Sequence, residues 1–95
     1  MRKLAIAVPA LLTACAAAQP PVHGMTQGHR CQSETAGSFV GRTATSETGA
    51  AILEATHAAI LRWAPPGAML TMDYRYDRVT VRIGPDGRIG SVSCG

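Results

Sequence analysis

The N-terminal segment limits most strongly what the chain can fold into. Residues 1–14 have the features of a targeting signal, which is not part of the folded domain. Arg2 and Lys3 precede an uninterrupted apolar run from Leu4 to Leu12. The run has the length of a signal-peptide core and is too short for a membrane-spanning helix, which needs about 20 apolar residues. We therefore expect residues 1–14 to be a signal peptide, so that a chain of 95 residues leaves room for one small domain.

The end of the apolar run carries a second targeting feature. Leu12-Thr13-Ala14-Cys15 resembles the lipobox of bacterial lipoproteins, in which cleavage precedes the cysteine and its thiol carries the lipid. The resemblance implies lipidation of Cys15. Because Ala16 and not Asp follows the cysteine, it also implies an outer membrane lipoprotein that faces the periplasm or the cell surface. The alternative is ordinary secretion into the periplasm or medium, with Ala14, Ala16 or Ala18 in an Ala-x-Ala type cleavage site.

The charge of the chain belongs mainly to the targeting segment. Two of the nine basic residues leave with the signal peptide, and seven basic against six acidic residues give the mature chain a net charge of +1. No cluster of Lys and Arg remains, so the sequence does not indicate a nucleic-acid partner.

The cysteines define the limits of the domain. If Cys15 carries lipid, Cys31 and Cys94 remain as one pair in an oxidising compartment, and we expect them to form a disulfide that closes a domain of residues 31–95. On the chain-entropy model, closing a loop of this length stabilises the fold by about 4 kcal/mol, which matters for a thin core. Residues 15–30, with Gln19-Pro20-Pro21, are expected to be the lipidated cysteine and a flexible tether.

The first half of the domain predicts one helix followed by a strand. Glu47–His57 consists mostly of good helix formers, Thr45 or Ser46 can cap it, and a stop near Ala58 is expected. The expected apolar face combines Ala50, Leu53 and His57 with Ile52. Ile60–Trp63 then predicts a short strand before the breaker Pro65-Pro66-Gly67.

The last third predicts a hairpin. Val79, Val81 and Ile83 alternate with polar residues, as in a half-buried strand. Gly84-Pro85-Asp86-Gly87 favours a turn, and residues 88–94 are the expected return strand, with a bulge at Gly90.

Between these elements lies a segment without turn residues. Residues 68–77 contain Leu70, two methionines and two tyrosines but neither Gly nor Pro. We expect an extended loop, and an extended loop that carries apolar side chains usually has a binding partner.

Several motifs together resemble the small bacterial and fungal elastase-inhibitor family, which is itself similar to the potato inhibitor I fold. They are Val40-Gly41-Arg42, Pro66-Gly67, Thr71-Met72-Asp73-Tyr74-Arg75, Asp77-Arg78 and Cys94-Gly95. The resemblance covers about residues 31–95, and its specific part is the run from Thr71 to Arg78.

The resemblance implies an α+β fold: one helix packed on a small mixed β-sheet with an extended protease-binding loop. It implies a scissile bond between Met72 and Asp73, with Met72 in the specificity pocket of a serine protease of the elastase, subtilisin or chymotrypsin type. The reactive loop would comprise Leu70, Thr71, Met72, Asp73 and Tyr74.

Arginines are expected to support such a loop. Arg78 is placed to donate hydrogen bonds to Thr71 and Asp73, and Arg75 to assist. In the potato-type inhibitors a second arginine usually lies two positions after the first. Here that position is Thr80, so we expect a softer loop.

The sequence does not predict an enzyme, a metal site or a cofactor. It contains no Ser-His-Asp arrangement with a nucleophile elbow and no phosphate-binding Gly loop, and no second Cys or His completes a metal site near His29. We expect a monomeric inhibitor. The alternative is an envelope lipoprotein that does not inhibit proteases and uses the same fold as a structural or interaction module.

Overall fold

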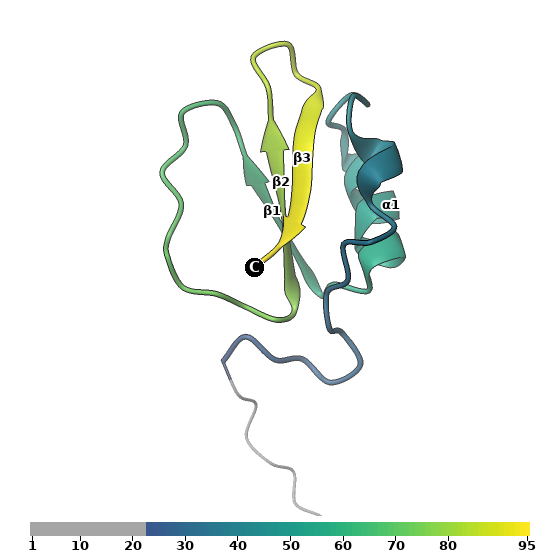
Figure 1. Cartoon of the computed structure of the whole chain (residues 1–95), viewed down its shortest axis with the longest axis vertical. Helices are drawn as coiled ribbons and strands as arrows, with labels where there is room; N and C mark the ends of the chain where they lie inside the picture. The colour runs from purple at the N-terminus through teal and green to yellow at the C-terminus, as the bar shows by residue number, and fades with distance from the viewer. Residues whose placement is uncertain (1–22) are drawn as a thin grey trace, which may run out of the picture.

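The computed structural model describes residues 23–95, which form one α-helix, one short 3-10 helix and one three-stranded sheet (Figure 1). The elements are the 3-10 helix η1 (Gly37–Phe39), helix α1 (Ser46–Thr56) and the strands β1 (Ile60–Ala64), β2 (Arg78–Ile83) and β3 (Ile89–Cys94). The expected signal peptide, Cys15 and the first part of the tether lie outside the described residues. Between residues 23 and 95 no helix has the length and apolar character needed to cross a membrane.

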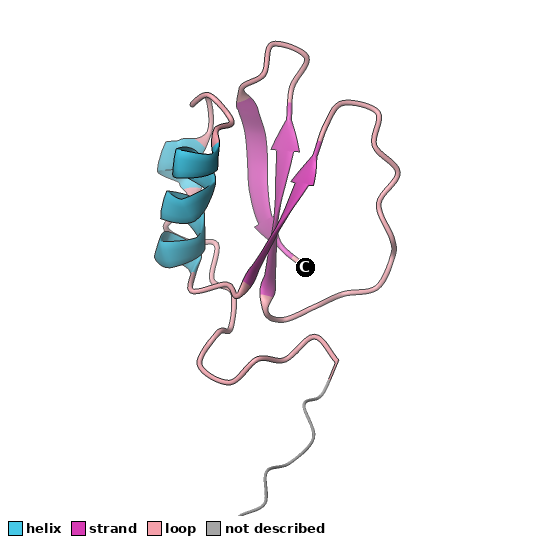
Figure 2. Ribbon diagram, turned by 180° about the vertical axis from the view of Figure 1, so that it is seen from behind, coloured by secondary structure: helices cyan, strands magenta, loops and turns pink. Residues whose placement is uncertain are grey.

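The sheet is mixed. β1 runs parallel to β2, with Leu61 opposite Val79, and β2 runs antiparallel to β3, with Val81 opposite Val92. The helix covers one face of the sheet, and the connection from β1 to β2 extends away on the other side (Figure 2). The predicted α+β fold, one helix on a small mixed sheet, is confirmed.

The predicted hairpin joins β2 and β3. Gly87 donates its N–H to Gly84 O at 3.0 Å, and its φ of 78° is the left-handed conformation that glycine adopts without strain. Ile83 pairs with Ile89 while Arg82 pairs with Ser91, so Gly90 is the extra residue of a bulge, as predicted.

Helix α1 begins and ends close to the predicted positions. The Thr45 hydroxyl accepts a hydrogen bond from the N–H of Thr48 at 3.1 Å, and Glu47 lies in the positive first turn. His57 ends the helix in the left-handed conformation, with φ 64°.

The predicted inner face of the helix is partly wrong. Ile52 is fully buried and Leu53 is partly buried, but Ala50 and His57 are exposed. The other two buried residues of the helix are Gly49 and Thr56. Gly49 leaves space for the Trp63 ring, because a Cβ there would lie 2.8 Å from Trp63 Cζ2. The other is Thr56, which is buried because its hydroxyl donates to Ile52 O at 2.8 Å.

The core lies between the helix and the sheet. It is formed by small and medium-sized apolar side chains: Cys31, Ala36, Phe39, Ile52, Ala58, Val79, Val81 and Ile89. The expected disulfide is present, with Cys31 and Cys94 Cα atoms 5.7 Å apart. It fastens the segment before η1 to the end of β3.

Residues 23–30, which the sequence assigns to a flexible tether, lie against the domain. Gly24 O accepts the N–H of Asp77 at 3.0 Å, and His29 Nδ1 lies 3.0 Å from His57 O. The packed unit therefore includes residues that precede the predicted domain boundary at Cys31.

Candidate functional site

The connection between the parallel strands β1 and β2, residues 65–77, forms a wide loop on the side of the sheet away from the helix (Figure 2). Met72 is 97% exposed and Met69 is 96% exposed. Exposed methionines have no role in packing the domain itself, so their side chains are free to contact another molecule.

The residue before Met72 is fastened to the sheet. Arg62 of β1 donates from Nη1 to the Thr71 hydroxyl at 3.1 Å and from Nε to the Thr80 hydroxyl at 3.2 Å. Arg62 and Thr80 are directly opposite each other in the parallel register. One guanidinium therefore connects the loop to two neighbouring strands.

The residue after Met72 is fastened by Arg78. Its Nη2 donates to the main-chain oxygen of Asp73 at 2.7 Å, and its Nε donates to the main-chain oxygen of Gly95 at 3.1 Å. The Thr80 hydroxyl donates to the same Gly95 oxygen at 2.7 Å. Gly95 thus accepts hydrogen bonds from two side chains of β2.

The charges under the loop suit a carboxylate at position 73. A hydrogen bond from the Thr71 hydroxyl, with smaller contributions from the Asp73 N–H and the Arg78 charge, lowers the pKa of the Asp73 carboxyl. Asp73 is therefore ionised at neutral pH. Thr71 itself accepts from Arg62, so the residue before Met72 is connected to β1.

The ring of Tyr74, the next loop residue, lies against Gly95. A Cβ on Gly95 would lie 2.7 Å from Tyr74 Cε2, so the ring packs directly over the glycine. Tyr74 and Tyr76 form an edge-to-face pair with ring centroids 5.0 Å apart, and Arg30 lies over the Tyr76 ring at 5.3 Å.

The loop ends at a buried carboxylate. The Asp77 side chain is 1% exposed and accepts two hydrogen bonds from Arg75, at 3.0 and 3.1 Å. Thr26 donates a third at 2.6 Å. The bonds from Arg75 lower the pKa of Asp77 despite its burial.

The predicted support is confirmed in part: Arg78 bonds Asp73 as expected, but it does not bond Thr71. Arg78 bonds the Asp73 main chain, while Thr71 is bonded by Arg62. Arg75 bonds Asp77 at the end of the loop. Sequence reasoning missed Arg62 and the hydrogen bonds of Thr80 and Gly95, because only the register of β1 on β2 shows that Arg62 and Thr80 are neighbours.

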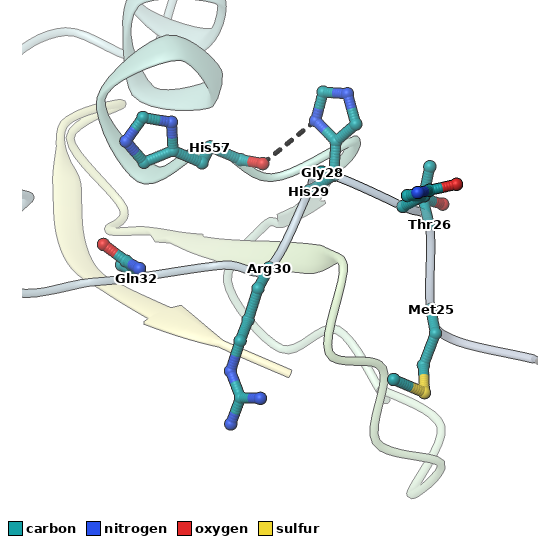
Figure 3. Close-up of a pocket in the computed structure, with 8 residues that line it drawn as sticks. Met25, Thr26, Gly28, His29, Arg30, Gln32 and His57 are labelled. Carbon is teal, nitrogen blue, oxygen red and sulfur yellow. Dashed lines mark hydrogen bonds between the residues drawn. The ribbon is translucent and has the colours of Figure 1, made fainter.

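A concave region outside the loop is lined mostly by residues that precede η1. It is an open cleft of about 550 Å³ beside the end of α1, in which His29 and His57 lie near each other (Figure 3). Its further lining is Met25, Thr26, Gln27, Gly28, Arg30 and Gln32. Over residues 23–95 no three His, Cys, Asp or Glu side chains gather as a metal site would require.

A small disulfide-closed domain with a supported, exposed loop is the architecture of a binding module. The family model described as "Peptidase inhibitor I78 family" matches residues 31–95, and the chain belongs to that family. Among solved structures, the elastase inhibitor AFUEI is similar, with 25% sequence identity and a TM-score of 0.50 over 62% of this chain and 81% of that chain. A comparison with curated protein sequences gave no match.

These comparisons bear out the resemblance noted from the sequence motifs. Both the family and the structural neighbour are described as peptidase inhibitors, so the chain is a member of a peptidase-inhibitor family.

Proposed function

We propose that the chain inhibits serine peptidases by presenting residues 70–74 as a substrate, with Met72–Asp73 as the scissile bond. The observation that carries the proposal is the contrast around Met72. Its side chain is almost fully exposed, while the Thr71 hydroxyl and the Asp73 main chain are bonded to arginines of β1 and β2. A side chain held out on a fixed backbone is what a specificity pocket requires.

The mechanism follows from that contrast. The serine Oγ of the protease attacks the Met72 carbonyl carbon, and breaking the peptide bond forms an acyl-enzyme and releases the amine of Asp73. Both new ends remain attached to the sheet, one through β1 and one through β2. Because Arg78 holds the Asp73 oxygen, the amine stays close to the ester and can re-form the peptide bond.

The side chains of the loop indicate the type of protease. Met72 is flexible and apolar, which suits the pockets of elastase, chymotrypsin or subtilisin better than the acidic pocket of trypsin. Leu70, Thr71 and Tyr74 would contact the enzyme on either side of the bond, pairing their main chain with it as an added strand does.

The test is a titration of the chain without its signal peptide, oxidised, against subtilisin, elastase, chymotrypsin and trypsin. We expect saturation near one inhibitor per enzyme for the first three and weaker inhibition of trypsin. If a folded, uncleaved chain inhibits none of the four, the inhibitory function is refuted and the non-inhibitory envelope role is supported.

We also propose that the inhibitor is anchored by lipid on Cys15 at the outer membrane, where it would act on proteases of the envelope or its surroundings. The support is the lipobox-like Leu12-Thr13-Ala14-Cys15 and the absence of Asp after the cysteine. The Cys15→Ser variant should leave the membrane fraction and lose labelling by a radioactive fatty acid. Unchanged membrane association of this variant would contradict the anchor.

A further inference from the structure

We infer that residues 23–26, which precede the family-matched domain, form a strap that positions the part of the loop following the Met72–Asp73 bond. The inference rests on the proposed function. The family match begins at Cys31, so the strap lies outside the matched region. Figure 1 shows this segment below the sheet, beside the point where the loop enters β2.

The strap bonds the residue that closes the loop. Gly24 O accepts the Asp77 N–H at 3.0 Å, and the Thr26 hydroxyl donates to the Asp77 carboxylate at 2.6 Å. The Asp77 main-chain oxygen in turn accepts N–H groups of Ala59 and Ile60 at 2.8 and 3.1 Å. Asp77 is thus held between the strap and the start of β1, and the strap completes its hydrogen bonding.

The strap also contacts the loop closer to the proposed scissile bond. Gly24 lies against the main chain of Arg75, because a Cβ on Gly24 would be 3.1 Å from Arg75 Cα. His23 lies between the Arg75 guanidinium, 3.4 Å from Nδ1, and the Asp73 carboxylate, 3.6 Å from Nε2. Residues 23–26 therefore contact positions 73, 75 and 77 of the loop.

These contacts act on the leaving group of the proposed reaction. After acylation the free amine belongs to Asp73, and its return depends on how far residues 73–77 can move. Arg78 holds Asp73 from the sheet, and the strap holds the same segment from the other direction. A strap that is displaced should leave binding of Met72 intact but let the amine escape, so that the inhibitor is cleaved faster.

The chain provides a matched pair of variants for the test. Gly24 and Gly28 both have φ +81°, so alanine carries the same backbone strain at each. Only Gly24→Ala also brings a Cβ against Arg75, because nothing lies within 4 Å of the position that Cβ would take on Gly28. The comparison isolates strap contact from backbone strain.

The experiment follows cleavage of the full exported chain by catalytic amounts of subtilisin, with mass spectrometry to identify the bond cut. We expect Gly24→Ala to be cleaved at Met72–Asp73 about tenfold faster than Gly28→Ala. A second pair avoids the backbone: Thr26→Val, which removes the donor to Asp77, should also be cleaved faster, and Thr26→Ser should restore the wild-type rate.

The outcomes separate the strap from the inhibitory function. Equal cleavage rates for Gly24→Ala and Gly28→Ala, with Thr26→Val like wild type, would overturn the strap while wild-type inhibition stands. Faster cleavage at many bonds would show general unfolding and would also overturn it. A wild-type chain that does not inhibit subtilisin would remove the proposed function, and the strap's role with it.

Discussion

At the scale of single residues, Arg62 has the most direct hold on the residue that precedes Met72. Its guanidinium donates hydrogen bonds to Thr71 and Thr80. Thr80 occupies the position at which the potato-type pattern has an arginine. Arg62→Ala removes a charged donor from the loop, which costs about 1.5 kcal/mol, close to tenfold in an equilibrium constant. We expect about tenfold weaker inhibition and faster cleavage at Met72–Asp73, measured by subtilisin titration.

The register of the sheet supplies the control for Arg62. Because Thr80 lies opposite Arg62, the double variant Arg62→Ala with Thr80→Arg brings a guanidinium to the same place from β2. Partial recovery of inhibition would show that a guanidinium at this place holds the loop. If Arg62→Ala inhibits as well as wild type, Arg62 has no part in holding the loop.

Asp77 gives the loop a dependence on pH. Hydrogen bonds from Arg75 lower its pKa in the folded state, so the stabilisation is fully present above the unfolded value of about 3.9 and is lost as pH falls through the lower folded value. We expect Asp77→Asn to be less stable than wild type by about 2–4 kcal/mol at pH 7, and this difference to shrink below about pH 4. Urea unfolding at pH 7 and pH 3 measures it; a difference independent of pH would contradict the assignment.

At the scale of elements, the contact between α1 and β1 depends on one glycine. A Cβ at Gly49 would lie 2.8 Å from Trp63 Cζ2, too close without movement of the ring or the helix. Gly49→Ala should therefore destabilise the domain by about 1–2 kcal/mol, although alanine favours helix. Gly37→Ala is the control, since its Cβ would meet nothing within 4 Å. Thermal unfolding of both variants measures the difference in stability. A stabilised Gly49→Ala variant would show that Trp63 does not need the space at Gly49.

The strands and the turn could be predicted from sequence because their signals are local. Alternation of Val79 and Val81 identifies β2, and the glycines at 84 and 87 mark the turn. The inner face of α1 could not be predicted in the same way. Gly49 is buried because the Trp63 ring, distant in sequence, packs on it, and Thr56 is buried because its hydroxyl bonds the helix main chain. The loop itself was recognisable from Thr71 to Arg78, but its support by Arg62 depends on strand register, which no local pattern reveals.

At the scale of the whole molecule, the disulfide connects stability to the loop. Cys94 precedes Gly95, whose main-chain oxygen accepts from Thr80 and Arg78 under the loop. Replacing Cys31 and Cys94 together by Ser should lower the free energy of unfolding by up to about 4 kcal/mol. It should also speed cleavage at Met72–Asp73, because Gly95 is then less firmly placed. Urea unfolding and subtilisin digestion measure the two effects, and unchanged stability would contradict the role of the disulfide.

Two methionines of nearly equal exposure, Met69 and Met72, lie on the loop, and only Met72 precedes the proposed scissile bond. The most direct test compares Met72→Lys with Met69→Lys, titrating each against trypsin and subtilisin. A lysine in the specificity pocket pairs with the acidic group of trypsin. We predict that Met72→Lys gains strong trypsin inhibition and loses affinity for subtilisin, while Met69→Lys keeps the wild-type preference. Trypsin inhibition gained at Met69, or at neither position, would contradict a scissile bond between Met72 and Asp73.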